Sequence, residues 1–378
     1  MIILFYGTSA ELIKMIGVTQ RIPRSELLLI CSSQHHNGLK KVHKQLNIYP
    51  DITLSNGWFG NDVMTIKQMF GMMMHAHAKF ALNLIPLRRK IRQHNKEHGT
   101  KSIAVVHGDT LTTVIGSYMG RALGLKVAHV EAGLRTHNWR SPFPEEIDRR
   151  IAGKIARIHF APSNLAESDL KKEHAKGEII NTHYNTAKDA IELSSSFLSD
   201  DFKKLVLPKK YCLVLLHRTE LIEKKDDLEA ILKVIYKHAS SKTPVVFTEH
   251  STTWEKIRSY GFEHYLEKDG LTVIHKQPYF DFMEIVRRAE YIVTDGGGLQ
   301  EDAYFLGIPA IIHRKATERQ DGLGFNAELS GLDTDKVAAF LTNHKNKSDL
   351  TRTIEAVSPS QIVIDTLVKN NYLKSPTK

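Results

Sequence analysis

Short apolar or β-branched runs alternate with amphipathic segments along the whole of this 378-residue chain. We expect strands at ten of these runs: 2–5, 27–31, 103–107, 126–130, 158–161, 211–216, 244–247, 271–274, 291–294 and 310–312. Helical patterns lie between them at 61–90, with a kink expected at Pro86, and at 110–123 and 226–238. Strands that alternate with helices are typical of βαβ units, so the chain is predicted to be an α/β protein with parallel sheets.

The length predicts more than one domain, because 378 residues exceed what one ordinary hydrophobic core holds. The charged, Pro-containing segment at 199–210 marks the break between two sets of strands. We therefore predict two Rossmann-like domains with an interdomain cleft, at residues 1–190 and 191–360. A last helix, within 361–378, is expected to pack back on the first domain.

The formal net charge of +10 predicts a surface that attracts anions, such as phosphorylated metabolites. Lys and Arg are mixed with acids along the chain, and no basic tract with interleaved aromatic residues occurs, which argues against nucleic acid as a partner. A substrate that carries a diphosphate explains the charge most simply.

Neither a membrane span, a signal peptide nor a metal site is expected. No apolar run approaches the roughly 20 residues of a membrane helix, and the opening MIILFYG reads as a first strand. Cys31 and Cys212 lie in apolar runs and are expected to be buried thiols, as in a cytoplasmic protein. The pairs His35-His36 and His75-x-His77 lack further ligands at metal-binding spacing.

Two carboxylates flank the segment VEAGLRTHNWRSPFPEE at 130–146. Glu131 follows a predicted strand, at the end where open α/β sheets bind ligands, and Glu145 opens a predicted helix. Acids on two separate elements can exchange protons with one small molecule when their environments set their pKa values apart. The alternative is that Glu145 and Glu146 only favour a helix N-terminus.

Two further turns of the first domain carry candidate residues. Asp109, in the sequence His-Gly-Asp-Thr, follows a predicted strand and is either a helix N-cap or a third acid near Glu131 with a raised pKa. The Gly7 turn precedes a helix that carries Lys14, which is placed to reach a phosphate or a sugar.

The second domain contains the stronger phosphate-binding pattern. Three glycines open a helix directly after a strand: Gly296, Gly297 and Gly298. This pattern lets the backbone approach a pyrophosphate, although an ordinary tight turn is the alternative. Glu301 is placed to bind ribose hydroxyls, and Arg319 is placed to close over the diphosphate. His217 and Arg218 end another strand and add a proton carrier and a positive charge.

Together these motifs resemble the bacterial UDP-N-acetylglucosamine 2-epimerase family, and more closely its non-hydrolysing branch. The matching motifs are HGDT at 107–110, VEAGLRT at 130–136, PFPEE at 142–146, HR at 217–218, GGGLQED at 296–302 and TER at 317–319. The resemblance implies a glycosyltransferase-B-like fold in which the second domain holds most of the nucleotide. It also implies a homodimer and a reaction that needs neither metal nor redox cofactor.

The reaction implied by the resemblance inverts C2 of a UDP-2-acetamido sugar, converting UDP-N-acetylglucosamine to UDP-N-acetylmannosamine for surface polysaccharide synthesis. UDP leaves C1 as a base removes the C2 proton, and UDP then adds back to the 2-acetamidoglucal. By motif position the acid/base set is Asp109, Glu131 and Glu145, with His217 assisting the UDP leaving group. The remaining residues expected to bind substrate or UDP are Lys14, Arg135, Asn185, Arg218, His250, Gly296, Gly297, Gly298, Glu301 and Arg319.

The chain departs from the family pattern at four positions: Ser9 for Arg, Tyr184 for Gly, Gly296 for Ser and Asp302 for Glu. His36 also replaces an Arg of the segment that forms an effector site in some members. These changes leave the identity of the sugar open. A hydrolysing enzyme, an epimerase of another UDP-2-acetamido sugar, a glycosyltransferase of the same fold and a non-catalytic nucleotide-sugar-binding protein are the alternatives.

Overall fold

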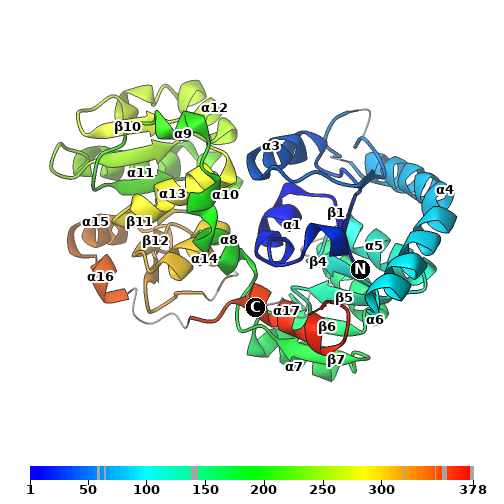
Figure 1. Cartoon of the computed structure of the whole chain (residues 1–378). Coiled ribbons are helices and arrows are strands. Elements are labelled where there is room, and N and C mark those ends of the chain that lie inside the picture. The colour runs from blue at the N-terminus through cyan, green and yellow to red at the C-terminus, as the bar shows by residue number, and fades with distance from the viewer. Residues whose placement is uncertain are drawn as a thin grey trace. The chain divides into compact units, whose positions relative to one another are not determined.

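The computed structural model describes residues 1–57, 60–63, 65–137, 144–317, 319, 321–344, 346–350 and 356–374 (Figure 1). Contacts within the chain divide it into two compact units. Unit 1 comprises Met1–Leu193 together with Val357–Lys378, and unit 2 comprises Ser194–Ala356.

Unit 1 is built on a seven-stranded sheet in the order β3-β2-β1-β4-β5-β6-β7, and every pairing is parallel. Its strands are β1 (Ile2–Tyr6), β2 (Leu27–Cys31), β3 (Ile52–Thr53), β4 (Ile103–His107), β5 (Lys126–Val130), β6 (Ile158–Ala161) and β7 (Glu178–Asn181). The direction of winding reverses between β1 and β4. In open α/β sheets ligands bind at this switch point, beyond the carboxyl ends of the strands.

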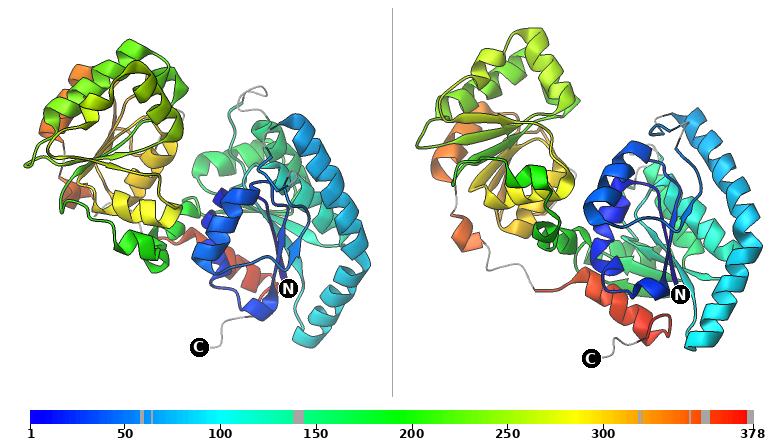
Figure 2. Two further views of the ribbon diagram at one scale, coloured as in Figure 1. Left: turned by 90° about the horizontal axis from the view of Figure 1, so that it is seen from above. Right: turned by 45° about the horizontal axis from the view of Figure 1, so that its top comes forward.

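The helices of unit 1 cover both faces of this sheet (Figures 1 and 2). They are α1 (Ser9–Lys14), α2 (Ile16–Thr19), η1 (Arg24–Glu26), α3 (His36–Leu46), α4 (Ile66–His98), α5 (Leu111–Ala122), α6 (Glu145–Ile155), α7 (Asn164–Lys172), α8 (Ala187–Glu192) and α17 (Pro359–Lys369). The last of these, α17, contacts α2 and α8, and the Ser360 amide donates to Asp189 Oδ2 at 2.7 Å. The C-terminal helix thus belongs to unit 1.

Helix α4 is longer than its sequence pattern predicts and begins later. The predicted helix covers 61–90, whereas α4 starts at Ile66, after a capping box between Thr65 and Gln68, and ends at His98. The chain continues through Pro86 as one helix, and Gly99 stops it in the left-handed conformation (φ +66°). The caps therefore decide its ends.

Unit 2 repeats the same winding in a six-stranded parallel sheet of order β10-β9-β8-β11-β12-β13. Its strands are β8 (Cys212–Leu215), β9 (Val245–Thr248), β10 (Leu271–Ile274), β11 (Tyr291–Thr294), β12 (Ala310–Ile312) and β13 (Ala327–Leu329). Its helices are η2 (Ser194–Phe197), α9 (Asp200–Lys203), α10 (Thr219–Ile222), α11 (Lys225–His238), α12 (Ser251–Tyr260), η3 (Glu263–Leu266), α13 (Tyr279–Arg288), α14 (Gly297–Leu306), α15 (Thr334–Asn343) and α16 (Lys347–Leu350). The switch point lies between β8 and β11.

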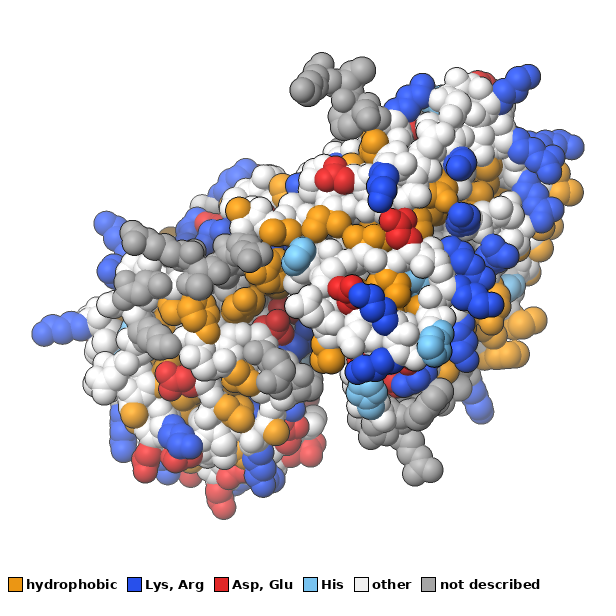
Figure 3. Space-filling view, turned by 90° about the horizontal axis from the view of Figure 1, so that it is seen from below, with side chains coloured by type: hydrophobic (Ala, Val, Ile, Leu, Met, Phe, Trp, Pro, Cys, Tyr) orange, Lys and Arg blue, Asp and Glu red, His pale blue; other side chains and the backbone are white. Residues whose placement is uncertain are grey.

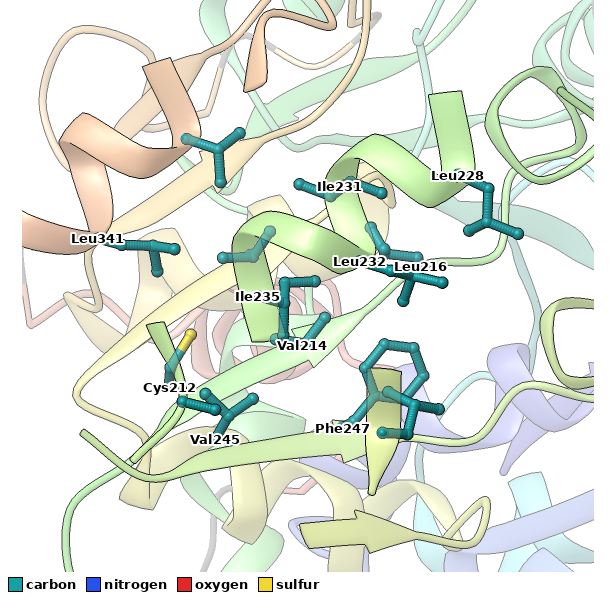
Figure 4. Packing of buried hydrophobic residues seen from close by; sticks show 14 of the residues in the cluster. Cys212, Val214, Leu216, Leu228, Ile231, Leu232, Ile235, Val245, Phe247 and Leu341 are labelled. Atoms are coloured by element: carbon teal, nitrogen blue, oxygen red, sulfur yellow. The ribbon is translucent and has the colours of Figure 1, made fainter. Parts of the chain in front are cut away.

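The core of unit 2 lies between its sheet and the amphipathic helix α11. Figure 4 shows side chains of one face of α11 against residues of β8 and β9; those labelled include Ile231, Ile235, Val214 and Phe247. All four are fully buried. Burying a side chain of this size stabilises the fold by about 1.5–3 kcal/mol. Because the apolar residues of α11 recur every three to four positions, they share one face, and their burial holds that face against the sheet.

The ten predicted strands are all present, each with its ends within one residue of the prediction, and the α/β class with two parallel Rossmann-like sheets is confirmed. Three strands were not predicted: β3, β7 and β13. Each lies at the edge of its sheet and has two to four residues. Edge strands are half exposed and short, so their apolar signal is weak.

Other sequence predictions concern the surface and the thiols. Cys31 and Cys212 are buried free thiols, as predicted. Among the helices of the described residues, none has the length and apolar character that a bilayer crossing requires. Lys and Arg side chains are scattered over the face in Figure 3 and are interrupted by hydrophobic and uncharged ones.

Candidate active site

Glu11 joins the two turns at the switch point of unit 1. Its Oε2 accepts the Gly7 and Thr8 amides, both at 2.8 Å, in a capping box at the start of α1. Its Oε1 accepts the Thr110 hydroxyl at 2.6 Å, from the turn that follows β4. Because Glu11 is buried, these bonds fix the position of the β4 turn, which carries Asp109. The T-x-x-E pattern at Thr8 signals the cap in the sequence, but not the bond to Thr110.

Glu131 lies directly after β5, where neighbouring side chains stabilise its negative charge. Lys14 Nζ donates to its two carboxyl oxygens at 3.1 and 2.8 Å, and His107 Nε2 lies 3.2 Å from Oε2. Burial raises the pKa of Glu131, but the charge of Lys14 and the contact with His107 outweigh it and hold that pKa well below its usual range. The backbone of Glu131 is left-handed (φ +63°), a strained conformation of the kind that clusters at functional sites.

Asp109 is held by an arginine from α6. The Arg149 Nε donates to Asp109 Oδ2 at 2.9 Å, and a second guanidinium nitrogen donates to the same oxygen. About a third of the Asp109 side chain is exposed, so the carboxylate is both oriented and accessible. The sequence did not single out Arg149, and its only signal is a position four residues after Glu145, on the same side of the helix.

Asp148 on α6 lies near Asp109 and near Glu145 of its own helix. Glu145 Oε2 is buried, and no hydrogen-bond partner for it exists among the described residues. Asp148, one turn later, is also buried. Burial, together with the charges of Asp109 and Glu145, raises the pKa of Asp148 to about 7. We refer to Asp109, Glu145 and Asp148 as the acid cluster. Asp148 was missed in the sequence, where its i+3 spacing from Glu145 was the available signal.

Glu146 and Arg135 take part in an ion-pair network. Glu146 is fully buried and accepts the Thr136 amide at 3.1 Å and the Arg150 guanidinium at 2.9 and 3.1 Å. Arg135 donates to both carboxyl oxygens of Glu173, at 2.9 and 2.7 Å. These contacts tie the segment after β5 to α6 and α7. Substrate binding by Arg135 stays a prediction.

The side chain of Asn185 bonds the first residue of a helix in unit 1. Its Oδ1 accepts the Ala187 amide at 2.9 Å at the start of α8, and its side chain is buried. This hydrogen bond lies within the protein, so the predicted role of Asn185 in binding substrate stays a prediction. Pro142 and Phe143 of the PFPEE motif lie outside the described residues. Glu318 of the TER motif in unit 2 lies outside them as well.

In unit 2, Asp295 organises the switch point between β8 and β11. Its buried carboxylate accepts the His217 amide at 2.9 Å and the Arg218 amide at 2.8 Å. It also lies 3.2 Å from His217 Nδ1, so it orients the imidazole ring. The sequence placed Asp295 in the glycine turn and did not predict that it holds the β8 turn.

The glycine turn itself forms the start of α14. Gly296 is the N-cap, and a Cβ there would lie 2.7 Å from His217 Cε1, so only glycine lets this ring approach. Gly297 and Gly298 occupy the first helical positions, where free N–H groups and the helix dipole favour an anion. An unobstructed Cβ position at Gly298 shows that the turn is open there.

Arg319 and Glu301 pair with each other. Arg319 Nη1 lies 3.0 Å from Glu301 Oε2, and Gln300 holds the segment after β12 by donating to the carbonyls of Arg319 and Asp321 at 3.2 and 2.9 Å. His250 caps α12 at the end of β9, and its ring lies 5.2 Å from that of His217. Burial, and then the charge of His217, lowers the pKa of His250.

The predicted residues therefore gather as two sets, each within one unit. Those in unit 1 are Lys14, Asp109, Glu131, Arg135, Glu145 and Asn185, and those in unit 2 are His217, Arg218, His250, Gly296, Gly297, Gly298, Glu301 and Arg319. No group of three or more His, Cys, Asp or Glu side chains within the described part of the chain could hold a metal ion.

The comparison with known sequences covers almost all of these residues. The sequence profile of the UDP-N-acetylglucosamine 2-epimerase family matches residues 19–360. This chain belongs to that family. Its relatives include proteins named UDP-N-acetylglucosamine 2-epimerase from Bacillus subtilis and Methanococcus maripaludis, each 30% identical to it. The first match covers 88% of this chain and 83% of that protein, and the second covers 88% of both.

The fold is shared with solved structures of the family. The UDP-GlcNAc 2-epimerase of Methanocaldococcus jannaschii superposes with a TM-score of 0.75 at 26% identity, over 97% of this chain and 98% of that one. The resemblance inferred from the motifs is thus confirmed at the level of family and fold.

Proposed function

We propose that this chain converts UDP-N-acetylglucosamine to UDP-N-acetylmannosamine by inverting C2. Relatives of this chain are named for this activity. The observation that supports the same activity here is the contrast between two carboxyl environments in unit 1. Glu131 is held ionised by Lys14 and His107, whereas Asp109 and Glu145 belong to a cluster of acids. A reaction that removes a proton from one face of a carbon and delivers one to the other needs two such environments.

In the proposed reaction one carboxylate takes the C2 proton while the C1–O bond to UDP breaks, which leaves a 2-acetamidoglucal. The other carboxyl then gives a proton to the opposite face of C2 as UDP adds back to C1. Lys14 is placed to keep Glu131 ionised, since its ammonium group bonds both carboxyl oxygens.

The nucleotide end is assigned to residues of unit 2. The start of α14 supplies amides for the diphosphate, and Arg218 and Arg319 add positive charge. His217, oriented by Asp295, lies against Gly296 and is proposed to stabilise the UDP leaving group. Glu301 is proposed to bind the ribose hydroxyls. Its ion pair with Arg319 would have to break so that its carboxylate can accept hydrogen bonds from the sugar.

A homodimer and the supply of a surface polysaccharide precursor are further parts of the proposal. Among the side chains of helix α4 that the structure describes, four large apolar ones are exposed: Phe70, Met74, Leu82 and Ile85. Tyr118 of α5 is exposed as well. Exposed apolar side chains grouped on one helix favour association with another surface.

The test is incubation of the purified chain with UDP-N-acetylglucosamine in deuterium oxide, followed by NMR of the products. We expect both C2 epimers to form and each to carry deuterium at C2, with no net loss of nucleotide sugar. Free N-acetylmannosamine plus UDP would indicate the hydrolysing reaction instead. Binding without exchange at C2 would contradict the proposal, and Glu131→Gln serves as the inactive control.

A further inference from the structure

The proposed mechanism makes no use of Asp148, although burying its carboxyl group without a partner destabilises the folded chain. The residue is only 6% exposed, and its Oδ2 has no hydrogen-bond partner among the described residues. No ion pair holds it either within that part of the chain. Because a buried ionised carboxylate without a partner is strongly unfavourable, Asp148 must carry a proton or exchange one with its neighbours.

The neighbours of Asp148 are acids. Glu145 lies one turn earlier on α6 and also has a buried oxygen without a described partner. The adjacent Arg149 directs its guanidinium to Asp109. Helix α5 packs against α6, but its two ionisable side chains, Tyr118 and Arg121, are exposed.

The strand that packs against α6 brings no cation to Asp148. Strand β5 carries an exposed Lys126 and the buried His129. Burial, more than any other influence, lowers the pKa of His129 to about 3, so that ring is neutral. The charges that act on Asp148 are thus those of Asp109 and Glu145.

We propose that Asp148 keeps a proton at neutral pH and shares it with Asp109 and Glu145, so that the acid cluster holds one transferable proton. Asp148 is then a positioning residue, because it acts through two acids of the proposed acid/base set. The proposal rests on the proposed epimerase function for its role in turnover, but not for the protonation itself.

Because no direct hydrogen bond joins the three carboxyls, all of which lie in the described part of the chain, the proton passes through a water. The O–H bond of Asp148 breaks as its proton goes to that water, which gives one of its own to the ionised Asp109 or Glu145, and that acid can then protonate C2. The cluster regains a proton from water, while the proton taken from C2 leaves its carboxyl to water. The raised pKa of Asp148, caused by burial and by Asp109 and Glu145, is consistent with a group that keeps its proton near neutrality.

The first test uses NMR of the full-length chain labelled with 13C at the aspartate carboxyl carbon. We expect one resonance that titrates with a midpoint between about pH 6 and 8, and we expect Asp148→Asn to remove it. Asp226→Asn, which removes an exposed carboxyl on α11, should leave that resonance in place. The absence of any aspartate that titrates near neutrality in the wild type would overturn the proposal, whether or not the variant folds and whether or not the chain is an epimerase.

The second test is the pH profile of C2 exchange. In Asp148→Asn we expect kcat to fall at least about 10-fold with KM within a factor of about 3, and the limb near neutrality to move by about one pH unit or more. Asp148→Glu should restore that limb, which a loss of packing alone would not explain. A wild-type profile in Asp148→Asn, with the NMR resonance still removed, would overturn the role in turnover but not the shared proton.

Discussion

Lys14 donates hydrogen bonds to both carboxyl oxygens of Glu131, at 3.1 and 2.8 Å, although the two residues are 117 positions apart in the sequence. Lys14 lies at the end of α1 and Glu131 just after β5. The side chain of Glu131 is 8% exposed and that of Lys14 is 24% exposed, so this ion pair is mostly buried. Such a pair adds little net stability, but removing one partner leaves an uncompensated charge.

Replacing Lys14 by Met should therefore destabilise unit 1. We expect the free energy of unfolding at pH 7, measured with urea, to fall by about 3 kcal/mol. Glu131 has a depressed pKa in the folded chain, so its contribution is present above its unfolded pKa and is lost as pH falls through its folded pKa. The acid part of this pH dependence should disappear in the variant.

The matched control is the double variant Lys14→Met/Glu131→Gln. Because the neutral amide needs no counter-charge, the double variant should be more stable than Lys14→Met alone. Equal stability of Lys14→Met and the wild type at pH 7 would show that the pair does not hold Glu131 ionised.

The glycines at the start of α14 should respond differently to alanine. A Cβ on Gly296 would lie 2.7 Å from His217 Cε1, whereas a Cβ on Gly298 would meet nothing within 4 Å. We expect Gly296→Ala to lower the free energy of unfolding by about 1–3 kcal/mol through overpacking. Gly298→Ala should leave it unchanged or raise it by up to about 1 kcal/mol. Urea unfolding measures both, and equal effects would contradict the close contact.

His129 should make stability depend on pH. It is fully buried, its Nε2 lies 2.7 Å from the Gly108 carbonyl, and burial lowers its pKa to about 3. The unfolded chain binds one more proton there between about pH 6.5 and 3, so stability falls as pH falls across this window, by up to about 1.4 kcal/mol per pH unit.

His129→Asn should reduce that slope. Urea unfolding between pH 7 and pH 4.5 measures it, with His264→Asn as the control because His264 is exposed. If the slope is the same in His129→Asn and the wild type, a neutral buried His129 is not its source.

The exposed face of α4 provides a test of the homodimer. Leu82 and Ile85 are 80% and 61% exposed, and Val206 of unit 2 is 87% exposed. We expect the double variant Leu82→Glu/Ile85→Glu to halve the mass measured by light scattering, because charges cannot be buried in an apolar interface. Val206→Glu should leave the mass unchanged. A monomeric wild type would refute the dimer.

Most of the predicted strands were found because they are local apolar runs buried on both faces of a parallel sheet, whereas the predicted edge strand β10 is only partly buried. The acids at strand ends, such as Asp109 and Glu131, were recognised for the same reason, since the strands fix where the turns fall. The edge strands β3, β7 and β13 were missed, because they are short and partly exposed.

The partners of the acids were not predictable. Lys14 bonds Glu131, Arg149 bonds Asp109 across 40 positions, and no local pattern in the sequence indicated either pair. The predicted contact of Lys14 with a phosphate or sugar stays a prediction. No pattern in the sequence singled out Asp148, which is distinguished by its burial.

The sequence by itself determined the two parallel sheets, the family and the residue types at the strand ends, because periodicity and motif spacing depend on residues that are close together in the sequence. Only the tertiary structure decided which charges face one another and which are removed from water. Those two factors set the ionisation of Glu131 and Asp148, because a pKa depends on burial and on nearby charges whatever their separation along the chain.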